Sequence, residues 1–187
     1  FPYKGEGTQS VYILDNETGA LVYSSGDNKS GPESRLISQV LANDSGKIIQ
    51  NGHAVGNHTY NHLNGFKTNL SEYEQNVKTA NLIIHSKLFR PPYGRIRPLQ
   101  AYRLKKNYII VMWSLLSLDY EKNLNISHTL NILYKNLITD SIIVFHDSIK
   151  SEKNMKIMLP KFIEYALENN FKFEILSEDL FNKRGGF

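Results

Sequence analysis

Apolar runs of a few residues alternate with longer helix-like stretches from about Lys47 to the end of the chain. This alternation is typical of successive strand–helix units around a mostly parallel sheet. The clearest helix begins with a capping box at 71–74, where a serine and a glutamate would pair with free backbone N–H groups. Its expected apolar face follows the helical repeat and consists of Tyr73, Val77, Ala80 and Ile84.

The apolar runs are the expected strands. Two of them are rich in β-branched residues and unbroken, as in strands buried on both faces, and they lie at 108–113 and 141–145. The other runs lie at 53–57, 88–89 and 171–176. Further helices are expected from Pro98 to about Lys106, from a Ser127 cap to about Leu137, and from about Pro160 to Glu168.

The first 46 residues follow another pattern. Two apolar runs, 11–14 and 20–23, flank a polar stretch ending in glycine, which predicts a β-hairpin with a five-residue loop. A short helix is expected at 33–41. We therefore expect a single domain over 1–187, with an atypical N-terminal segment at 1–46 and strand–helix units at 47–182.

Length and composition agree with one globular domain. A chain of 187 residues can bury a sizeable core but is short for two domains. The hydrophobic fraction of 41% and the charged fraction of 21% are those of an ordinary globular protein. No apolar run approaches the length of a membrane span, and the absence of Cys excludes disulfides and thiolate metal sites.

The net charge of +4 suits an anionic partner such as a cell-wall polymer, although lysines that only solvate the helices give the same balance. No block of Lys and Arg is dense enough to indicate nucleic-acid binding, so no nucleic-acid partner is expected. Because the chain begins at Phe1 and not Met, we expect it to be processed, with any export signal already removed. A periplasmic or secreted location is favoured, and a cytoplasmic one stays open.

Polar residues capable of chemistry follow several of the expected strands. His58, Arg90, Asp119 and the pair His146-Asp147 each come at the downstream end of an apolar run. In an α/β barrel the carboxyl ends of the strands converge on one mouth. The sequence therefore predicts that these residues gather at one site.

His58 and His62 stand four residues apart. If this segment turns helically after its strand, both imidazoles project from one face and can bind one cation. Neutral imidazole suits zinc and other borderline divalent metals. The alternative is a turn whose histidines hydrogen-bond to the backbone.

Two further residues suit catalysis by their positions. Arg90 precedes two prolines, which fix the backbone and hold the guanidinium in one direction; the alternative is a loop with a surface arginine. His146 can act as a general acid when a carboxylate keeps it protonated, and Asp119 or Asp147 could be that carboxylate. The alternative is a partly buried histidine bonded to the backbone.

Four stretches, in order, resemble the polysaccharide deacetylases, the NodB-homology group of carbohydrate esterase family 4. They are 52–62 (GHAVGNHTYNH), 90–94 (RPPYG), 113–120 (WSLLSLDY) and 141–147 (SIIVFHD). The similarity runs from about Lys47 to Leu180. It implies the family's α/β fold, a distorted (β/α) barrel of the NodB-homology type, here preceded by the atypical N-terminal hairpin.

The resemblance also implies roles for single residues. His58 and His62 are the implied histidine ligands of a divalent metal, zinc with cobalt as the alternative. His146 is the implied general acid, Arg90 orients the catalytic base, and Asp119 sets the state of the catalytic histidine.

Three aromatic residues are implied to face the substrate. Tyr93 would contribute its backbone N–H to the oxyanion site, and Trp113 and Phe145 would line the pocket for the acetyl methyl group. Tyr120 stands where the family often has tryptophan.

The family's first motif is not recognisable in this chain. The family opens with a strand ending in Thr-Phe-Asp-Asp-Gly-Pro, in which the first Asp is the general base and the second is a metal ligand. The nearest stretch is 13–18 (ILDNET), which would keep the base as Asp15 and replace the ligand by Asn16. Asp27 and Asp44 are further candidates. Either the acidic pair is supplied differently or it is missing.

The implied function is metal-dependent removal of N-acetyl groups from an N-acetylglucosamine-containing polysaccharide, with peptidoglycan, chitin-like polymers and acetylated xylan all open as partners. One alternative is a catalytically inactive, deacetylase-like carbohydrate-binding domain that has lost the first motif. A basic nucleic-acid-binding protein is the other. Metal content and acetate release distinguish the enzyme from its inactive counterpart.

Overall fold

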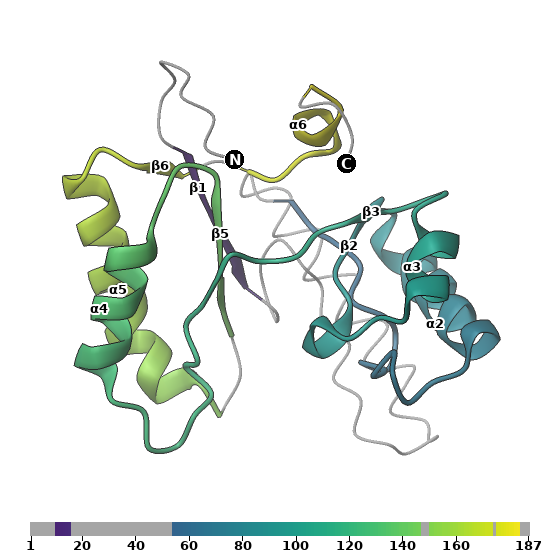
Figure 1. Ribbon diagram of the computed structural model, residues 1–187, viewed down its shortest axis with the longest axis horizontal. Coiled ribbons are helices and arrows are strands. Elements are labelled where there is room, and N and C mark those ends of the chain that lie inside the picture. Colours follow the sequence, from purple (N-terminus) through teal and green to yellow (C-terminus); the bar gives the residue numbers. More distant parts are fainter. Residues whose placement is uncertain (1–9, 16–53, 147–149, 174, 184–187) are drawn as a thin grey trace. The chain divides into compact units, whose positions relative to one another are not determined.

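The computed structural model describes residues 10–15, 54–146, 150–173 and 175–183 (Figure 1). The chain divides into two compact units, which are described separately below. One unit comprises residues 1–14 and 113–174, and the other comprises residues 15–112 and 175–187. The expectation of a single domain stays a prediction.

The first unit is built on a four-stranded sheet with the order β4-β5-β1-β6. These strands are β4 (Leu115–Leu116), β5 (Ser141–Phe145), β1 (Ser10–Asp15) and β6 (Lys172–Phe173). β4 is parallel to β5, and β1 is parallel to β6 with Ser10 opposite Lys172. Helices α4 (Ile126–Asn136) and α5 (Glu152–Glu168) lie beside each other along this sheet (Figure 1).

The core of the first unit lies between these helices and β5. Ile143 and Phe145 face it from the strand, and both are almost completely buried. Their helical partners are Leu130, Leu133, Met158, Phe162 and Ala166. Burial of these side chains is the main force that holds the helices on the sheet.

The second unit holds a smaller parallel sheet of β2 (Leu88–Phe89) and β3 (Ile109–Ile110), and Asn57 forms a parallel bridge to Phe89. Its helices are α2 (Leu70–Ile84), η1 (Pro92–Gly94), α3 (Pro98–Leu104) and α6 (Glu178–Lys183). The buried residues of α2 are Tyr73, Val77, Ala80 and Ile84, which confirms the expected apolar face. Lys87 and Glu178 form an ion pair at 3.0 Å between their charged atoms.

Gln100 fixes the loop that leads into α2. Its side chain is 1% exposed and donates to the carbonyls of Gly65 and Thr68, both at 3.0 Å. Its carbonyl oxygen accepts from the backbone N–H of Arg97 at 2.9 Å. A Cβ atom on Gly65 would lie 2.4 Å from the Arg95 carbonyl oxygen, so glycine is required there by the close approach of backbone.

Helix ends differ from the sequence predictions in three places. Asn69, and not the predicted Ser71 box, caps α2 by accepting from the Glu72 N–H at 2.9 Å. Asn125 caps α4 in place of Ser127. Helix α5 begins at Glu152 and contains Pro160 in its interior, so the proline does not mark its start. Asparagine is among the strongest N-caps, and each capping asparagine precedes the predicted serine by two residues.

The strands also differ from the predictions. The run 108–113 contributes only β3, which is half-buried, while β4 was not predicted as a separate strand. Among the described residues of the run 53–57, Asn57 pairs with a strand, and among those of the run 171–176, residues 172–173 form β6. The α6 helix was also not predicted.

The expected N-terminal hairpin is described only in its first arm. That arm is β1, which has β5 and β6 as its neighbours in the sheet. The second arm at 20–23 and the helix expected at 33–41 lie outside the described residues.

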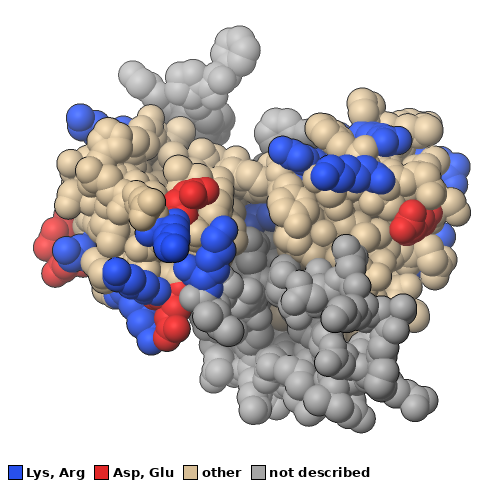
Figure 2. Space-filling model, turned by 90° about the horizontal axis from the view of Figure 1, so that it is seen from below, with Lys and Arg blue, Asp and Glu red and all other residues tan. Residues whose placement is uncertain are grey.

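Charged side chains are distributed in small groups on the face shown in Figure 2, where several groups of Lys and Arg have acidic residues close by. None of the helices described is both long enough and apolar enough to span a bilayer.

Candidate active site

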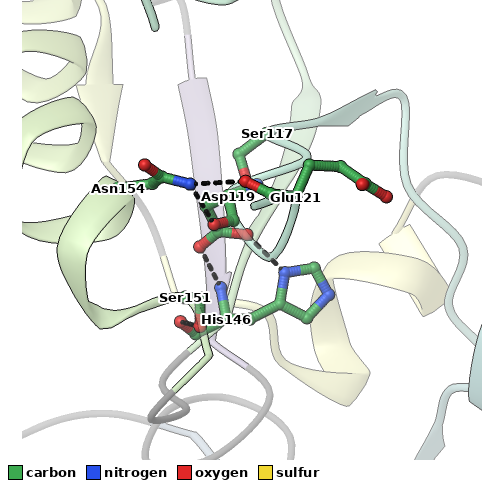
Figure 3. A network of polar contacts seen from close by, with 6 residues as sticks. All are labelled: Ser117, Asp119, Glu121, His146, Ser151 and Asn154. Atoms are coloured by element: carbon green, nitrogen blue, oxygen red, sulfur yellow. Dashed lines mark hydrogen bonds and ion pairs between the residues drawn. The ribbon is translucent and has the colours of Figure 1, made fainter. Parts of the chain in front are cut away.

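Asp119 and His146 form a tightly bonded pair in the first unit (Figure 3). The Nδ1 atom of His146 lies 2.6 Å from Oδ1 of Asp119, and the backbone N–H of His146 donates to Oδ2 at 2.7 Å. The Asp119 side chain is fully buried, and that of His146 is 20% exposed. The carboxylate therefore fixes both the ring and the backbone of the histidine.

This pairing decides which nitrogen of His146 is available for chemistry. A carboxylate accepts hydrogen bonds, so Nδ1 carries a proton and Nε2 is the nitrogen left for a substrate. Tyr120 packs edge-on against the imidazole, with ring centroids 4.9 Å apart. The Lys150 ammonium lies 5.3 Å from the centre of the Tyr120 ring. Burial, then the charges of Glu121 and Asp119, raise the pKa of the Tyr120 hydroxyl.

Three polar side chains surround this pair. Ser117, which is bonded to Val144 through its backbone N–H, accepts from the Asp119 N–H at 3.3 Å. Asn154 donates to the carbonyl of Asp119, and Ser151 donates to the carbonyl of His146 at 2.6 Å. The sequence reasoning did not find Ser117, Ser151 or Asn154, because their roles depend on contacts with residues distant in sequence.

The rings of His58 and His62 lie together in the second unit, with centroids 5.0 Å apart. His58 is 3% exposed, and its Nδ1 lies 2.6 Å from the Arg90 carbonyl oxygen. Since a carbonyl only accepts, Nδ1 carries the hydrogen and Nε2 keeps a lone pair. A backbone partner of this kind is the usual means of orienting a metal-binding histidine.

The segment between the two histidines forms a turn, and not the helical arrangement that was one of the two expectations. Thr59 and His62 adopt left-handed backbone conformations, with φ of 64° and 51°. Such a conformation is costly for a β-branched residue and persists only where surrounding contacts enforce it. The Thr59 hydroxyl accepts from the Leu63 N–H at 3.0 Å, which closes the turn.

Two asparagines hold this turn on the scaffold. Asn57 is fully buried, donates to the Val77 carbonyl in α2 at 2.8 Å and accepts from the Thr59 N–H at 3.0 Å. The Asn76 side-chain oxygen accepts from the N–H groups of Tyr60 and Asn61 at 2.7 and 2.9 Å. The adjacency of the histidine rings thus arises from fixed loop geometry, and Asn76 was another residue that the sequence did not reveal.

Arg90 is the largest fully buried side chain of the described residues. Its Nε donates to the Val111 carbonyl at 3.2 Å, and its backbone N–H donates to the Asn57 carbonyl at 2.9 Å. Burial lowers the pKa of the Arg90 guanidinium to about 9, so it still carries its charge at neutral pH. Arg90 therefore connects Asn57, which precedes His58, to Val111, which follows β3. Because it is buried, it is not the surface arginine of the alternative interpretation.

The three implied substrate residues have different surroundings. Tyr93 is 61% exposed, has a φ of 58°, and its ring centroid lies 4.6 Å from that of His62. Trp113 is half-buried. Phe145 is 1% exposed and packs on Phe162 in the core of the first unit, with ring centroids 5.8 Å apart. Their roles toward a substrate stay predictions.

The His58–His62 pair fits a metal ion in donor type and spacing. Imidazole nitrogen binds zinc at ~2.1 Å, and two rings whose centroids are 5.0 Å apart are close enough to share one ion. Within the described ranges, no cluster of three or more His, Asp or Glu side chains is arranged to hold a metal. Asp15 ends β1, while Asn16, Asp27, Asp44 and Asp147 lie outside the described residues.

Comparisons with known proteins agree with the motifs. Residues 26–108 match the family model of the polysaccharide deacetylases. A peptidoglycan-N-acetylglucosamine deacetylase of Bacillus cereus is 34% identical over 109 residues, which are 54% of this chain and 39% of that protein. A solved peptidoglycan N-acetylglucosamine deacetylase is 25% identical with a TM-score of 0.67, over 94% of this chain and 88% of that one. The chain is therefore similar to the polysaccharide deacetylases, in sequence over part of its length and in fold over most of it.

The structural likeness to this solved deacetylase confirms the predicted fold class. Among the described residues the strands form the four-stranded and two-stranded sheets, and no closed barrel is recorded there. A pseudoenzyme of carbohydrate esterase family 4 from Bacillus anthracis has the same fold, with 15% identity and a TM-score of 0.67, over 92% of this chain and 65% of that one. The chain spans about two fifths of the Bacillus cereus relative, and the family match begins downstream of Asp15.

Proposed function

We propose that this chain is a polysaccharide deacetylase, a metal-dependent hydrolase that removes N-acetyl groups from an N-acetylglucosamine-containing polysaccharide. The observation that carries the proposal is the two-point bond of Asp119 to His146, which leaves Nε2 of a partly exposed histidine for proton transfer. Peptidoglycan is the first substrate to test, because the relatives named above act on it by name; chitin-like polymers come second.

The reaction splits the acetamide C–N bond with one water molecule and yields acetate and a free amine. His58 and His62 would hold a divalent cation, zinc or alternatively cobalt, which when bound would supply Lewis-acid assistance to the reaction. His146 donates the proton on Nε2 to the departing nitrogen, while Asp119 keeps the ring oriented and stabilises its charged form. The Tyr93 backbone N–H stabilises the developing oxyanion. Trp113 and Phe145 line the pocket for the acetyl methyl group.

A carboxylate must also accept a proton from the attacking water. We assign this role to Asp15, which is the last residue of β1. The assignment follows the resemblance of 13–18 to the family's first motif, in which the first Asp is the general base. Arg90 would orient this base through its buried guanidinium, which is charged at neutral pH.

The test is acetate release from purified peptidoglycan and from acetylated chito-oligosaccharides, with zinc or cobalt supplied. We expect stoichiometric zinc in the wild-type protein, loss of zinc in His62→Ala, and loss of turnover with zinc retained in His146→Ala. His128→Ala, an exposed histidine in α4, is the matched control and should behave as wild type. A protein that folds but binds no metal and releases no acetate would instead be the inactive carbohydrate-binding domain.

A further inference from the structure

Asp119 lies in a tight turn that the local sequence does not favour. The turn is closed by the Glu121 N–H, which donates to the Leu118 carbonyl at 2.9 Å. Leu118 adopts a left-handed conformation with a φ of 55°, which is costly for a residue with a Cβ atom. The turn therefore needs contacts from outside to keep the buried carboxylate in place.

One side chain of α5 supplies two such contacts (Figure 3). The Asn154 amide nitrogen donates to the Asp119 carbonyl at 2.8 Å and to the Glu121 carbonyl at 2.9 Å. Asn154 is 9% exposed, and both hydrogens of its amide have an acceptor. The amide thus ties two carbonyls of the turn to the first turn of α5.

The same helix start also holds the histidine. Ser151, the N-cap position of α5, is fully buried and donates to the His146 carbonyl at 2.6 Å. Asn154 follows it by one helical turn and bonds the backbone of Asp119. Both members of the Asp119–His146 pair are therefore anchored to one rigid element.

We infer that Asn154 is a positioning residue for general-acid catalysis: its amide sets the place of the Asp119 carboxylate and, through it, the orientation of the His146 ring. The kinetic part of this inference rests on the proposed deacetylase function. If Asn154 only filled space, a side chain of the same volume could replace it. Positioning Asp119 instead requires the two hydrogen-bond donors of the planar amide. An asparagine in the first turns of a helix otherwise has no advantage over a better helix former.

The decisive variant is Asn154→Asp, which keeps the shape and replaces the donor by an oxygen facing two carbonyl oxygens. Asn169→Asp is the matched control, because Asn169 lies at the C-terminal cap of the same helix and donates to one exposed carbonyl of Tyr165. NMR of protein labelled with ¹⁵N-histidine reports the proton between His146 and Asp119 directly. We expect this resonance to shift or broaden in Asn154→Asp and to stay unchanged in Asn169→Asp.

In the kinetic assay we expect the kcat of Asn154→Asp to fall about 10- to 100-fold, as for a small misplacement of a catalytic group, with KM changed by less than about twofold. Asn154→Ala, which removes the donors without adding charge, replaces it if the aspartate variant unfolds. A folded variant that keeps both the resonance and the kcat overturns the inference. If the wild-type protein releases no acetate, the proposed function fails, but the NMR measurement still decides the role of Asn154.

Discussion

His146 and Asp119 are joined at two points, through the ring Nδ1 at 2.6 Å and through the backbone N–H at 2.7 Å. Both oxygens of the carboxylate accept, and one histidine supplies both donors. A single bond would leave the ring free to rotate about the contact. The second bond fixes the carboxylate relative to the strand end, so the orientation of the ring follows from the backbone.

Asp119→Asn should therefore impair turnover strongly. The two His146 donors bond different carboxylate oxygens, and an amide keeps an oxygen at only one of these positions, so one bond is lost; an amide also does not stabilise a charged imidazole. We expect kcat for acetate release to fall by roughly 10²–10⁴ with little change in KM. The control Asp179→Asn, in the first turn of α6, should keep wild-type kinetics. Equal kcat in the two variants would contradict the role of Asp119.

Asn76 should determine how well the histidine pair binds a metal. Its oxygen accepts from two backbone N–H groups of the 58–62 turn, so Asn76→Ala should loosen that turn, whereas Asn76→Asp keeps an acceptor. We expect zinc affinity, measured by calorimetry, to fall about tenfold or more in Asn76→Ala, as for loss of a group that supports a metal ligand. It should stay near the wild-type value in Asn76→Asp. Equal affinities would show that the turn keeps its shape without this side chain.

Tyr73→Phe should stabilise the protein. The Tyr73 side chain is fully buried in α2, and no residue of the described part hydrogen-bonds to its hydroxyl. Burial raises the pKa of this hydroxyl, which therefore stays neutral. Removing a buried hydroxyl that has no partner should raise the free energy of unfolding by about 1 kcal/mol, read from urea denaturation. The control Tyr134→Phe removes an exposed hydrogen bond to the Lys161 carbonyl and should instead lower the free energy of unfolding slightly.

Gly65→Ala should destabilise the second unit. The added methyl would lie 2.4 Å from the Arg95 carbonyl oxygen and 2.8 Å from the Gln100 side-chain oxygen. Because the first neighbour is backbone, the loop must move and strain the Gln100 bonds. We expect a loss of about 1–3 kcal/mol in the free energy of unfolding. An unchanged thermal midpoint would show that the loop yields easily.

The sequence predicted best where a periodic pattern extends over several turns. The buried residues of α2 are the same four that the sequence predicted, because four apolar residues on one face of a helix can be buried together in only one orientation of that helix. Predictions that depended on a single residue were less accurate. Ser71 and Ser127 were plausible caps, but Asn69 and Asn125 stand two residues earlier and accept the first free N–H groups. Pro160 indicated a helix start, yet it lies within α5.

For the candidate site, the sequence suggested which residues to consider but not which side chains support them. The pairing of Asp119 with His146 was foreseen with Asp147 as the alternative, and the structure shows the Asp119 bond. The sequence left open whether the segment between His58 and His62 turns helically, and the structure shows a turn with left-handed Thr59 and His62 instead. Asn76 and Asn154 act through atoms far away in sequence, which no local pattern reveals.

The place of β1 in its sheet has a consequence for biosynthesis. β1 is synthesised well before its partner β6, because most of the printed sequence lies between the two strands. Until then an unpaired strand edge is available to other chains, which favours aggregation of nascent molecules. Removing either strand by truncation would leave the other with an open edge, so expression of shortened versions should yield insoluble protein.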